Sequence, residues 1–431
     1  MQAGFAAAEI TPPVGVMLNG FIARVAPSAG VDAPLFARAL WLQDEHTQSL
    51  IVALDVLGLS ISFADELTQE LAVRLGLAEE RVILCSTHTH SGPITCPLRG
   101  IGAPDNEYLA QLKRKIYSVA DAAANNFGPV DVLWGDAPVE IGVNRRQIDA
   151  SDGKAVLGRN PSGPKDQAVH MLWLKGDSAS TVLFVHACHP YCLGAEHPFI
   201  SPDFPGHATA ELARHGHNSI FLNGCAGDIA PLRAFEGPQA ARAEGERLAN
   251  AVLHACESAR RERAPRLGVQ SRRFQVPFDQ IPPTATLQQT LDCENRTVRR
   301  EEEGSDAVST RVRAAGDEWL RDLQLAIGAG DALPPQEARI SLVRIGGGAI
   351  VVLTSEVFYG TGQRIAARLQ ASPAIVAAYG HAFLGYLPER EAFAFGGYEV
   401  DESHRYINLW RTTPAVEDIL QEQVELLWNR A

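Results

Sequence analysis

Two histidines, His88 and His90, stand two residues apart in the segment THTHSGP, which follows the apolar run RVILC after one serine. In extended backbone, side chains at positions i and i+2 project from the same face, so both imidazoles can enter one pocket at the end of a strand. Imidazole is a frequent zinc ligand and titrates near neutral pH. The pair therefore predicts a metal site, with two surface histidines on a loop as the alternative.

A second histidine pair, His186 and His189, ends the apolar run TVLFVHACHP. At the spacing i and i+3 the two rings cannot both face one pocket in regular extended backbone, so we expect at most one of them to bind a metal. The spacing does not say which one. Cys188 and Cys192 lie beside them without forming a CxxC pair, which favours buried thiols over a structural metal site.

Glu356 ends a third apolar run, AIVVLTSEV, and could supply a carboxylate. Two histidines and one carboxylate are a ligand set of catalytic zinc that leaves a position for water. The alternative is an acid favoured by the dipole at a helix N-terminus. Asp203 in SPDFPG and Asp228 in NGCAGDIAP are weaker candidates, and Asp203 could instead cap a helix beginning near Pro205. Together with Asp55 they would be needed for a two-metal phosphatase.

The elements that must position these residues alternate along the chain. Helix-length amphipathic segments at 64–76, 106–127 and 240–261 separate runs rich in Val, Ile and Leu. Those strand-like runs are ALWL from 39, LIVALDVL from 50, RVILC from 81, VDVLWG from 130, TVLFVHA from 181, SIFLN from 219, RISLVRIG from 339 and AIVVLTSEV from 349. The alternation predicts an α/β fold with mixed or mainly parallel β-sheets surrounded by helices.

The segment at about 280–335 is polar, charged and helical in pattern, and strands return after it. We therefore expect residues 1–431 to form a single catalytic domain with a helical insertion at 280–335. The N-terminus lacks the positive region of a signal peptide. The longest apolar stretch, SLIVALDVLGLSISF, is too short to span a bilayer.

Composition and net charge indicate which kinds of binding partner to expect. The chain is 46% hydrophobic and 21% charged, which suits a globular core, and its net charge of −13 disfavours nucleic acid. Its seven cysteines form no CxxC pair, so we expect a reducing, cytoplasmic protein without a disulfide framework. The expected partner is a small-molecule substrate, with no nucleic acid and no membrane span. A homo-oligomer is compatible with the sequence.

Taken in order, these segments resemble the catalytic region of the neutral ceramidase family, the neutral/alkaline non-lysosomal ceramidases, which are zinc amidohydrolases. The resemblance spans nearly the whole chain. It rests on GFAAAEITPPVGVMLNGF, GVDAPLFARALWL, THTHSGP, GVNRR, HPYCLG, ISPDFPG, NGCAGDIAP, TSEVFYGTGQR and YLPEREAFAFGGYE. The string of motifs is far more specific than any one of them.

The resemblance implies one Zn²⁺ per chain and assigns a role to individual residues. The implied metal ligands are His88, His189, Glu356 and Tyr386, which favours His189 over His186. His90 would lie beside the zinc-bound water as the proton-transfer group. Arg145 and Tyr398 would line the reacting centre, and the substrate site would include Arg145, Tyr398, Asp203 and Ala230.

Two departures bear on the substrate. Ala230 stands where ceramidases carry a serine in the GD-x-S-P turn, and we expect no C-terminal immunoglobulin-like domain of the kind that the family has. We therefore expect cleavage of an amide C–N bond in a small or polar substrate rather than in ceramide. The alternatives are a zinc esterase or lactonase, an amidohydrolase of ceramide or another N-acyl lipid, and a non-catalytic binding protein.

Overall fold

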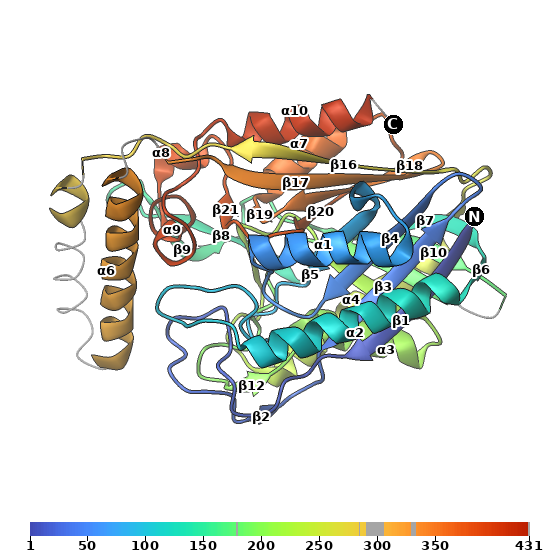
Figure 1. Ribbon diagram of the computed structural model, residues 1–431, viewed down its shortest axis with the longest axis horizontal. Helices are drawn as coiled ribbons and strands as arrows, with labels where there is room; N and C mark the ends of the chain where they lie inside the picture. The colour runs from blue at the N-terminus through green and yellow to red at the C-terminus, as the bar shows by residue number, and fades with distance from the viewer. Residues whose placement is uncertain (178–179, 284, 290–305, 329–332, 430–431) are drawn as a thin grey trace.

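Two β-sheets lie face to face in the centre of the molecule, with helices outside them (Figure 1). The computed structural model describes residues 1–177, 180–283, 285–289, 306–328 and 333–429. The predicted α/β architecture of mixed sheets surrounded by helices is confirmed. The assignment of residues 1–431 to one catalytic domain stays a prediction.

The larger sheet has nine strands in the order β16-β17-β18-β20-β5-β4-β3-β1-β6. Their bounds are β16 Leu267–Val276, β17 Gln336–Ile345, β18 Gly348–Thr354, β20 Ala374–Gly380, β5 Val82–Ser86, β4 Gln48–Leu54, β3 Phe36–Gln43, β1 Gln2–Glu9 and β6 Phe127–Pro129. In this sheet β18 pairs with β20, and β4 with β5, in parallel, and the other neighbouring strands of the described chain run antiparallel.

Of the two predicted forms, mixed or mainly parallel, the structure shows the mixed sheet. The short connections between strands explain why most neighbours are antiparallel. The turns at 44–47 and 346–347 join β3 to β4 and β17 to β18 within a few residues. A connection this short can form a hairpin but cannot cross over to a parallel neighbour.

The smaller sheet has five strands in the order β13-β11-β10-β7-β15. They are β13 Asn218–Asn223, β11 Ser180–His186, β10 Ala168–Lys175, β7 Asp131–Pro138 and β15 Arg260–Arg261. Short sheets complete the fold: β14 Ile229–Pro231 with β8 Gly142–Ile148 and β9 Ala155–Asn160, β19 Glu356–Val357 with β21 Tyr386–Leu387, and β12 Phe199–Ile200 with β2 Gly30–Val31.

The core between the two sheets is one buried apolar cluster. Leu40, Ile51 and Ile350 of the larger sheet meet Leu183 and Ile220 of the smaller one, and all are fully buried. Each aliphatic side chain removed from water in this way contributes about 1.5–3 kcal/mol. The cluster holds the two sheets, and the strand ends that they carry, in a fixed relation.

Helices cover the outer faces of both sheets. α1 (Ile61–Leu75) and α2 (Asn106–Asn125) pack on β1, β3, β4 and β5, and α3 (Asp203–Arg214) and α4 (Pro238–Glu257) on the smaller sheet. α7 (Tyr359–Arg368) packs on β20, and α10 (Val416–Trp428) on β16 and β17. The predicted segments at 64–76, 106–127 and 240–261 are thus α1, α2 and α4. The Ser60 hydroxyl caps α1 by accepting from Phe63 N, and Gly76 ends it in the left-handed conformation.

The predicted insertion at 280–335 lies partly outside the described residues. Within it, α6 (Asp306–Gly328) stands at the end of the molecule opposite the N-terminus, beside α9 (His404–Ile407) (Figure 1). Trp319 of α6 stacks on Trp410 with ring centroids 5.9 Å apart. This aromatic contact attaches α6 to the segment that follows α9.

The cysteines behave as predicted where the structure describes them. Cys85, Cys96, Cys188, Cys192 and Cys225 are free and buried, and Cys256 is free and half-buried, whereas Cys293 lies outside the described residues. In the described part of the chain, no helix has both the length and the apolar character needed to cross a membrane.

Candidate metal centre

Strands from both sheets end at one place, and the candidate residues follow those ends. β5 and β20 pair at Cys85 and Gly380, close to the C-terminal end of each strand. A bridge between Gly224 and Ala377 joins the end of β13 to β20, and β13 runs parallel to β11. The segments after β5, β11, β18 and β20 therefore start from neighbouring points, although they are far apart in the sequence.

The backbone at His88 differs from the extended form that the spacing predicted. His88 has a φ of 69°, in the left-handed region that non-glycine residues rarely occupy. Its amide donates to Val56 O at 3.0 Å, and the amide of His90 donates to Pro190 O at 3.3 Å. The direction of the two rings is therefore set by a turn, which hydrogen bonds to distant segments hold in place. It does not come from the alternation of side chains along a strand.

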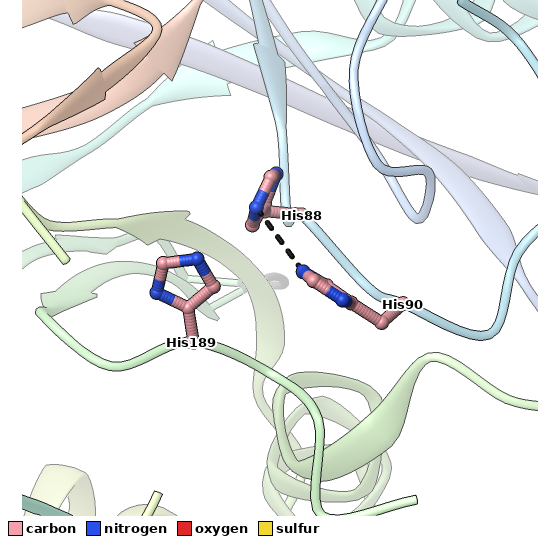
Figure 2. Close-up of side chains that lie close together, drawn as sticks. All are labelled: His88, His90 and His189. Atoms are coloured by element: carbon pink, nitrogen blue, oxygen red, sulfur yellow. Dashed lines mark hydrogen bonds between the residues drawn. The ribbon is translucent and has the colours of Figure 1, made fainter. Parts of the chain in front are cut away.

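Figure 2 shows His88, His90 and His189 with their rings turned toward one another. One ring nitrogen of each lies within 4.8 Å of the others, and the three residues are buried. The Nε2 atoms of His88 and His90 are 3.3 Å apart. His186 turns elsewhere, because its Nδ1 lies 3.0 Å from Ala168 O. The structure therefore brings His189, and not His186, beside the THTH segment.

Glu356 and Tyr386 reach the same place through a short parallel ladder. Glu356 lies opposite Tyr386 in the pairing of β19 with β21. The Oε2 atom of Glu356 is 3.3 Å from Nε2 of His88 and 3.0 Å from Nε2 of His189. The alternative role for Glu356, in the first turn of a helix, is wrong, because it lies in β19 and α7 begins at Tyr359.

The tautomers of two of these histidines are fixed by backbone carbonyls. Nδ1 of His88 lies 2.7 Å from Leu57 O, and Nδ1 of His189 lies 2.5 Å from Ala226 O. A carbonyl can only accept, so each Nδ1 carries the proton. In a neutral ring with the proton on Nδ1, the lone pair belongs to Nε2.

Two Nε2 atoms and the Glu356 carboxylate therefore converge, and each of them can act as an electron-pair donor to a metal ion. Burial lowers the pKa of His189 to about 3, and the Arg145 guanidinium acts in the same direction, so the ring stays neutral near pH 7. Burial alone would raise the pKa of Glu356, but its contacts with His88 and His189 hold the pKa below its usual range. Neutral imidazoles and a carboxylate at this spacing fit a divalent metal ion.

An arginine links the tyrosine to the histidines. Arg145 Nη2 donates to the Tyr386 hydroxyl at 2.9 Å, and its Nη1 lies 3.5 Å from His189 Nε2. The ring of Tyr398, the first residue of the π-helical turn η2 (Tyr398–Glu402), lies 5.9 Å from that of Tyr386. The predicted residues Arg145, Tyr386 and Tyr398 thus lie together beside the histidine cluster.

Sequence reasoning missed the acid that holds this arginine. Glu399 accepts from Arg145 Nε at 2.8 Å and from Arg146 Nη1 at 2.5 Å, and its side chain is 1% exposed. In the sequence, the position of Glu399 next to Tyr398 is the one feature that could have pointed to it. Glu399 aims the Arg145 guanidinium because it accepts from Nε and leaves both terminal nitrogens to face the site.

Replacing Glu399 by glutamine is expected to lower the free energy of unfolding by about 3–5 kcal/mol, because two buried guanidinium groups lose their common counter-charge. Urea unfolding measures this loss. The matched control is Glu425→Gln. The Glu425 side chain is 48% exposed, and that of its partner Arg368 is 53% exposed. That change should cost about 0–1 kcal/mol. Equal losses in the two variants would contradict the role given to Glu399.

Two further residues fix the histidine loops, and neither was predicted. Arg24 is buried and donates to His90 O at 2.7 Å and to Gly194 O at 3.1 Å. Asn223 donates to Thr87 O at 3.3 Å, and its Oδ1 accepts from Cys188 N at 3.3 Å. Asn223 therefore ties the segment of His88 to that of His189. Asn223 opens the NGCAGD motif, whereas no sequence signal marks Arg24.

The acidic turn residues do not join the histidine cluster. Asp203 is buried, has a φ of 54° and accepts from Leu193 N and Phe204 N at 3.0 and 2.8 Å. α3 begins at Asp203, two residues earlier than predicted. Asp228 accepts from Tyr359 N and Asn144 Nδ2, and Asp55 from Phe36 N and Arg38 Nη1. Among the described residues the metal-capable group consists of histidines, which gives a two-metal phosphatase no support.

Ala230 lies close to the site on β14, opposite Val143 of β8, and packs against Tyr191. The part of Asp203 and Ala230 in substrate binding stays a prediction.

Comparison with solved structures identifies the fold. A neutral ceramidase from Pseudomonas aeruginosa superposes with a TM-score of 0.74 at 18% identity, covering 100% of this chain and 74% of that one. A ceramidase complexed with C2 gives a TM-score of 0.73 at 17% identity, with 100% and 75% covered. No protein-family model and no curated protein matches the sequence. The chain therefore has a neutral-ceramidase-like fold, as its motifs predicted.

Proposed function

We propose, from this fold and from the converging donors of the histidine cluster, that the chain is a zinc-dependent hydrolase of amide C–N bonds. Its partner would be a small or polar substrate. The observation that carries the proposal is the pair of fixed tautomers, which direct two Nε2 lone pairs at a buried carboxylate. Such an arrangement favours a bound cation, because three buried electron-pair donors would otherwise face one another out of water or take up a proton.

The proposed metal ligands are His88, His189, Glu356 and Tyr386. Bound zinc supplies two kinds of chemistry in such sites, a lowered pKa of bound water and polarisation of a carbonyl oxygen. The carbonyls of Leu57 and Ala226 act as the outer partners that ligating histidines normally have. Burial raises the pKa of the Tyr386 hydroxyl well above its usual value, and Arg145, which donates to that hydroxyl, acts in the opposite direction, toward the phenolate form that a ligating tyrosine would need.

His90 suits proton transfer better than ligation. Its Nδ1 is buried and has no hydrogen-bond partner among the described residues, so no carbonyl fixes its tautomer. Burial lowers the pKa of His90 well below its usual value, and His88 and His189 add to the effect. A neutral imidazole can take a proton from the attacking water and pass it to the leaving nitrogen.

Arg145 and Tyr398 are the proposed stabilisers of the charge that develops on the carbonyl oxygen. Arg145 is already oriented by Glu399 and Tyr386, so little reorganisation is needed when that charge forms. Removing one such donor from an active site costs on the order of 3 kcal/mol of transition-state stabilisation.

The test combines metal analysis with a substrate panel. Purified protein is expected to contain about one zinc per chain, as a site of this ligand set would. It should hydrolyse small N-acyl amides, lose this activity with a chelator and regain it with Zn²⁺. Esters, lactones and ceramide complete the panel, because faster turnover of one of these would identify the alternative substrate class.

Two results would contradict the proposal. Protein that takes up no metal and stays inactive after reconstitution would be a binding protein with a hydrolase fold. Anomalous diffraction that locates two ions about 3.5–4 Å apart would indicate a two-metal enzyme instead.

A further inference from the structure

Three aromatic side chains form a wall beside His90. The ring of Phe21 lies 5.0 Å from that of His90, and the ring of Tyr191 lies 5.3 Å from it. Phe235 stacks on Tyr191 at 5.4 Å with an interplanar angle of 14°, and lies 6.0 Å from Phe21. The three residues come from segments that precede β2, follow β11 and follow β14, so only the folded chain brings them together.

Phe235 is held in place although it faces solvent. Phe235 is 53% exposed, and its backbone φ is 65°, a value that is rare for a bulky residue. Its amide donates to Tyr191 O at 3.3 Å. A backbone conformation that costs free energy and keeps a large apolar ring in water is more typical of a binding position than of packing.

A small buried apolar cluster that includes Ala230 lies behind the wall. Ala230 packs with Val143 and Tyr191, and Leu232 and Ala234 lie against the same cluster. The alanine adds no hydroxyl to this cluster. The surroundings of the wall are therefore aliphatic, and Phe235 is its exposed ring.

The place of His90 indicates which part of the substrate meets the wall. In amide hydrolysis the C–N bond breaks and a C–O bond forms, and one proton of the water reaches the leaving nitrogen. In the proposed function His90 carries that proton, so the leaving amine must lie on the His90 side of the carbonyl carbon. This is the side of Phe21 and Tyr191.

We infer that Phe21, Tyr191 and Phe235 form an aromatic subsite for the leaving group, and that the substrates are N-acyl derivatives of amines with an aromatic ring. The inference rests on the proposed function. Rings that meet edge-on or offset attract one another beyond the effect of their area, whereas a saturated ring of similar size lacks this term. Arg24, 5.1 Å from the Phe21 centroid, fixes the first ring of the wall.

The test compares N-benzylacetamide with N-(cyclohexylmethyl)acetamide, which share the acyl group and differ in the ring. The zinc-loaded protein should prefer the benzyl amide in kcat/KM by about 5- to 10-fold, the range of one or two ring contacts. Phe235→Ala should reduce this preference to less than about 2-fold. Tyr191→Phe, which keeps the ring, should retain it.

The matched control is Phe127→Ala, which removes an exposed phenyl ring from β6 at the far edge of the larger sheet. It should leave both rates and their ratio unchanged. Equal kcat/KM values for the two amides, or an undiminished preference in Phe235→Ala, would overturn the inference while the hydrolase proposal stands.

Failure of the proposed function would be visible separately, as absence of amide turnover in metal-loaded protein. Calorimetry with the free amines then tests the subsite by itself. Benzylamine should bind several-fold more tightly than cyclohexylmethylamine, and Phe235→Ala should abolish the difference. Equal affinities in the unmodified protein would overturn the subsite.

Discussion

Replacing His189 by alanine is expected to remove the metal and nearly all hydrolysis. Its Nε2 atom lies 3.0 Å from Glu356 Oε2, and its Nδ1 is held by Ala226 O, so the variant loses a ring nitrogen that is directed into the site. Metal affinity should fall by more than about 100-fold, since changes to outer partners alone cost 10- to 100-fold. Amide turnover should fall by at least about 1,000-fold, because the metal contributes several kcal/mol to the transition state.

The measurement is zinc content by elemental analysis together with kcat/KM on one amide. His186→Ala is the matched control. His186 is as buried as His189 and is the last residue of β11, which His189 follows, but its ring turns toward Ala168. Circular dichroism verifies that both variants are folded. The assignment is wrong if His186→Ala loses the metal, or if folded His189→Ala binds zinc as tightly as the unmodified protein.

Replacing His90 by alanine should separate chemistry from metal binding. We expect kcat to fall by about 100- to 10,000-fold, the contribution of a positioned acid–base group, while zinc content stays close to that of the unmodified protein. The reason lies in the contacts of the ring. Among the described residues its Nδ1 has no hydrogen-bond partner, unlike Nδ1 of His88 and His189, so this nitrogen can take up and release a proton during turnover.

Added imidazole provides a second measurement for this variant. A missing proton carrier can be replaced from solution, so imidazole should restore part of the activity of His90→Ala and none of that of His189→Ala. If zinc content collapses in His90→Ala while turnover per bound zinc is normal, His90 is a third histidine ligand. The distance of 3.3 Å between the Nε2 atoms of His88 and His90 makes this the alternative to exclude.

Sequence patterns predicted the elements well because those patterns are local. The 3.6-residue period of apolar positions identified α1, α2 and α4, and runs of Val, Ile and Leu identified β3, β4, β5, β11 and β13. The pairing of these strands was not predictable in the same way. Parallel and antiparallel neighbours bury similar side chains. Strand direction is decided instead by the length of the connections and by strands such as β20, which lies between β18 and β5, and β16, at one edge of the sheet.

The network around Arg145 shows the same limit at the level of single residues. Glu399 lies more than 250 positions from Arg145 in the sequence, and its role exists only because η2 packs against β8 and β9. Asn223 likewise looks like any residue at a strand end until Thr87 and Cys188 are placed on either side of it. Side chains that orient others are chosen by geometry, and their residue types alone do not reveal them.

The histidine pair of the THTH segment shows what the sequence determines and what only the tertiary structure decides. By itself the sequence determined the chemical types available, imidazoles and a carboxylate at the ends of apolar strands, and its motifs resembled one family closely enough to predict the fold. Only the tertiary structure brought His189 to His88 in place of His186, set Glu356 opposite Tyr386, and gave Nδ1 of His88 and of His189 a carbonyl partner, while Nδ1 of His90 has none among the described residues. The physical reason is that a lone pair acquires its direction from carbonyls and strand ends more than thirty residues away, which no local pattern records.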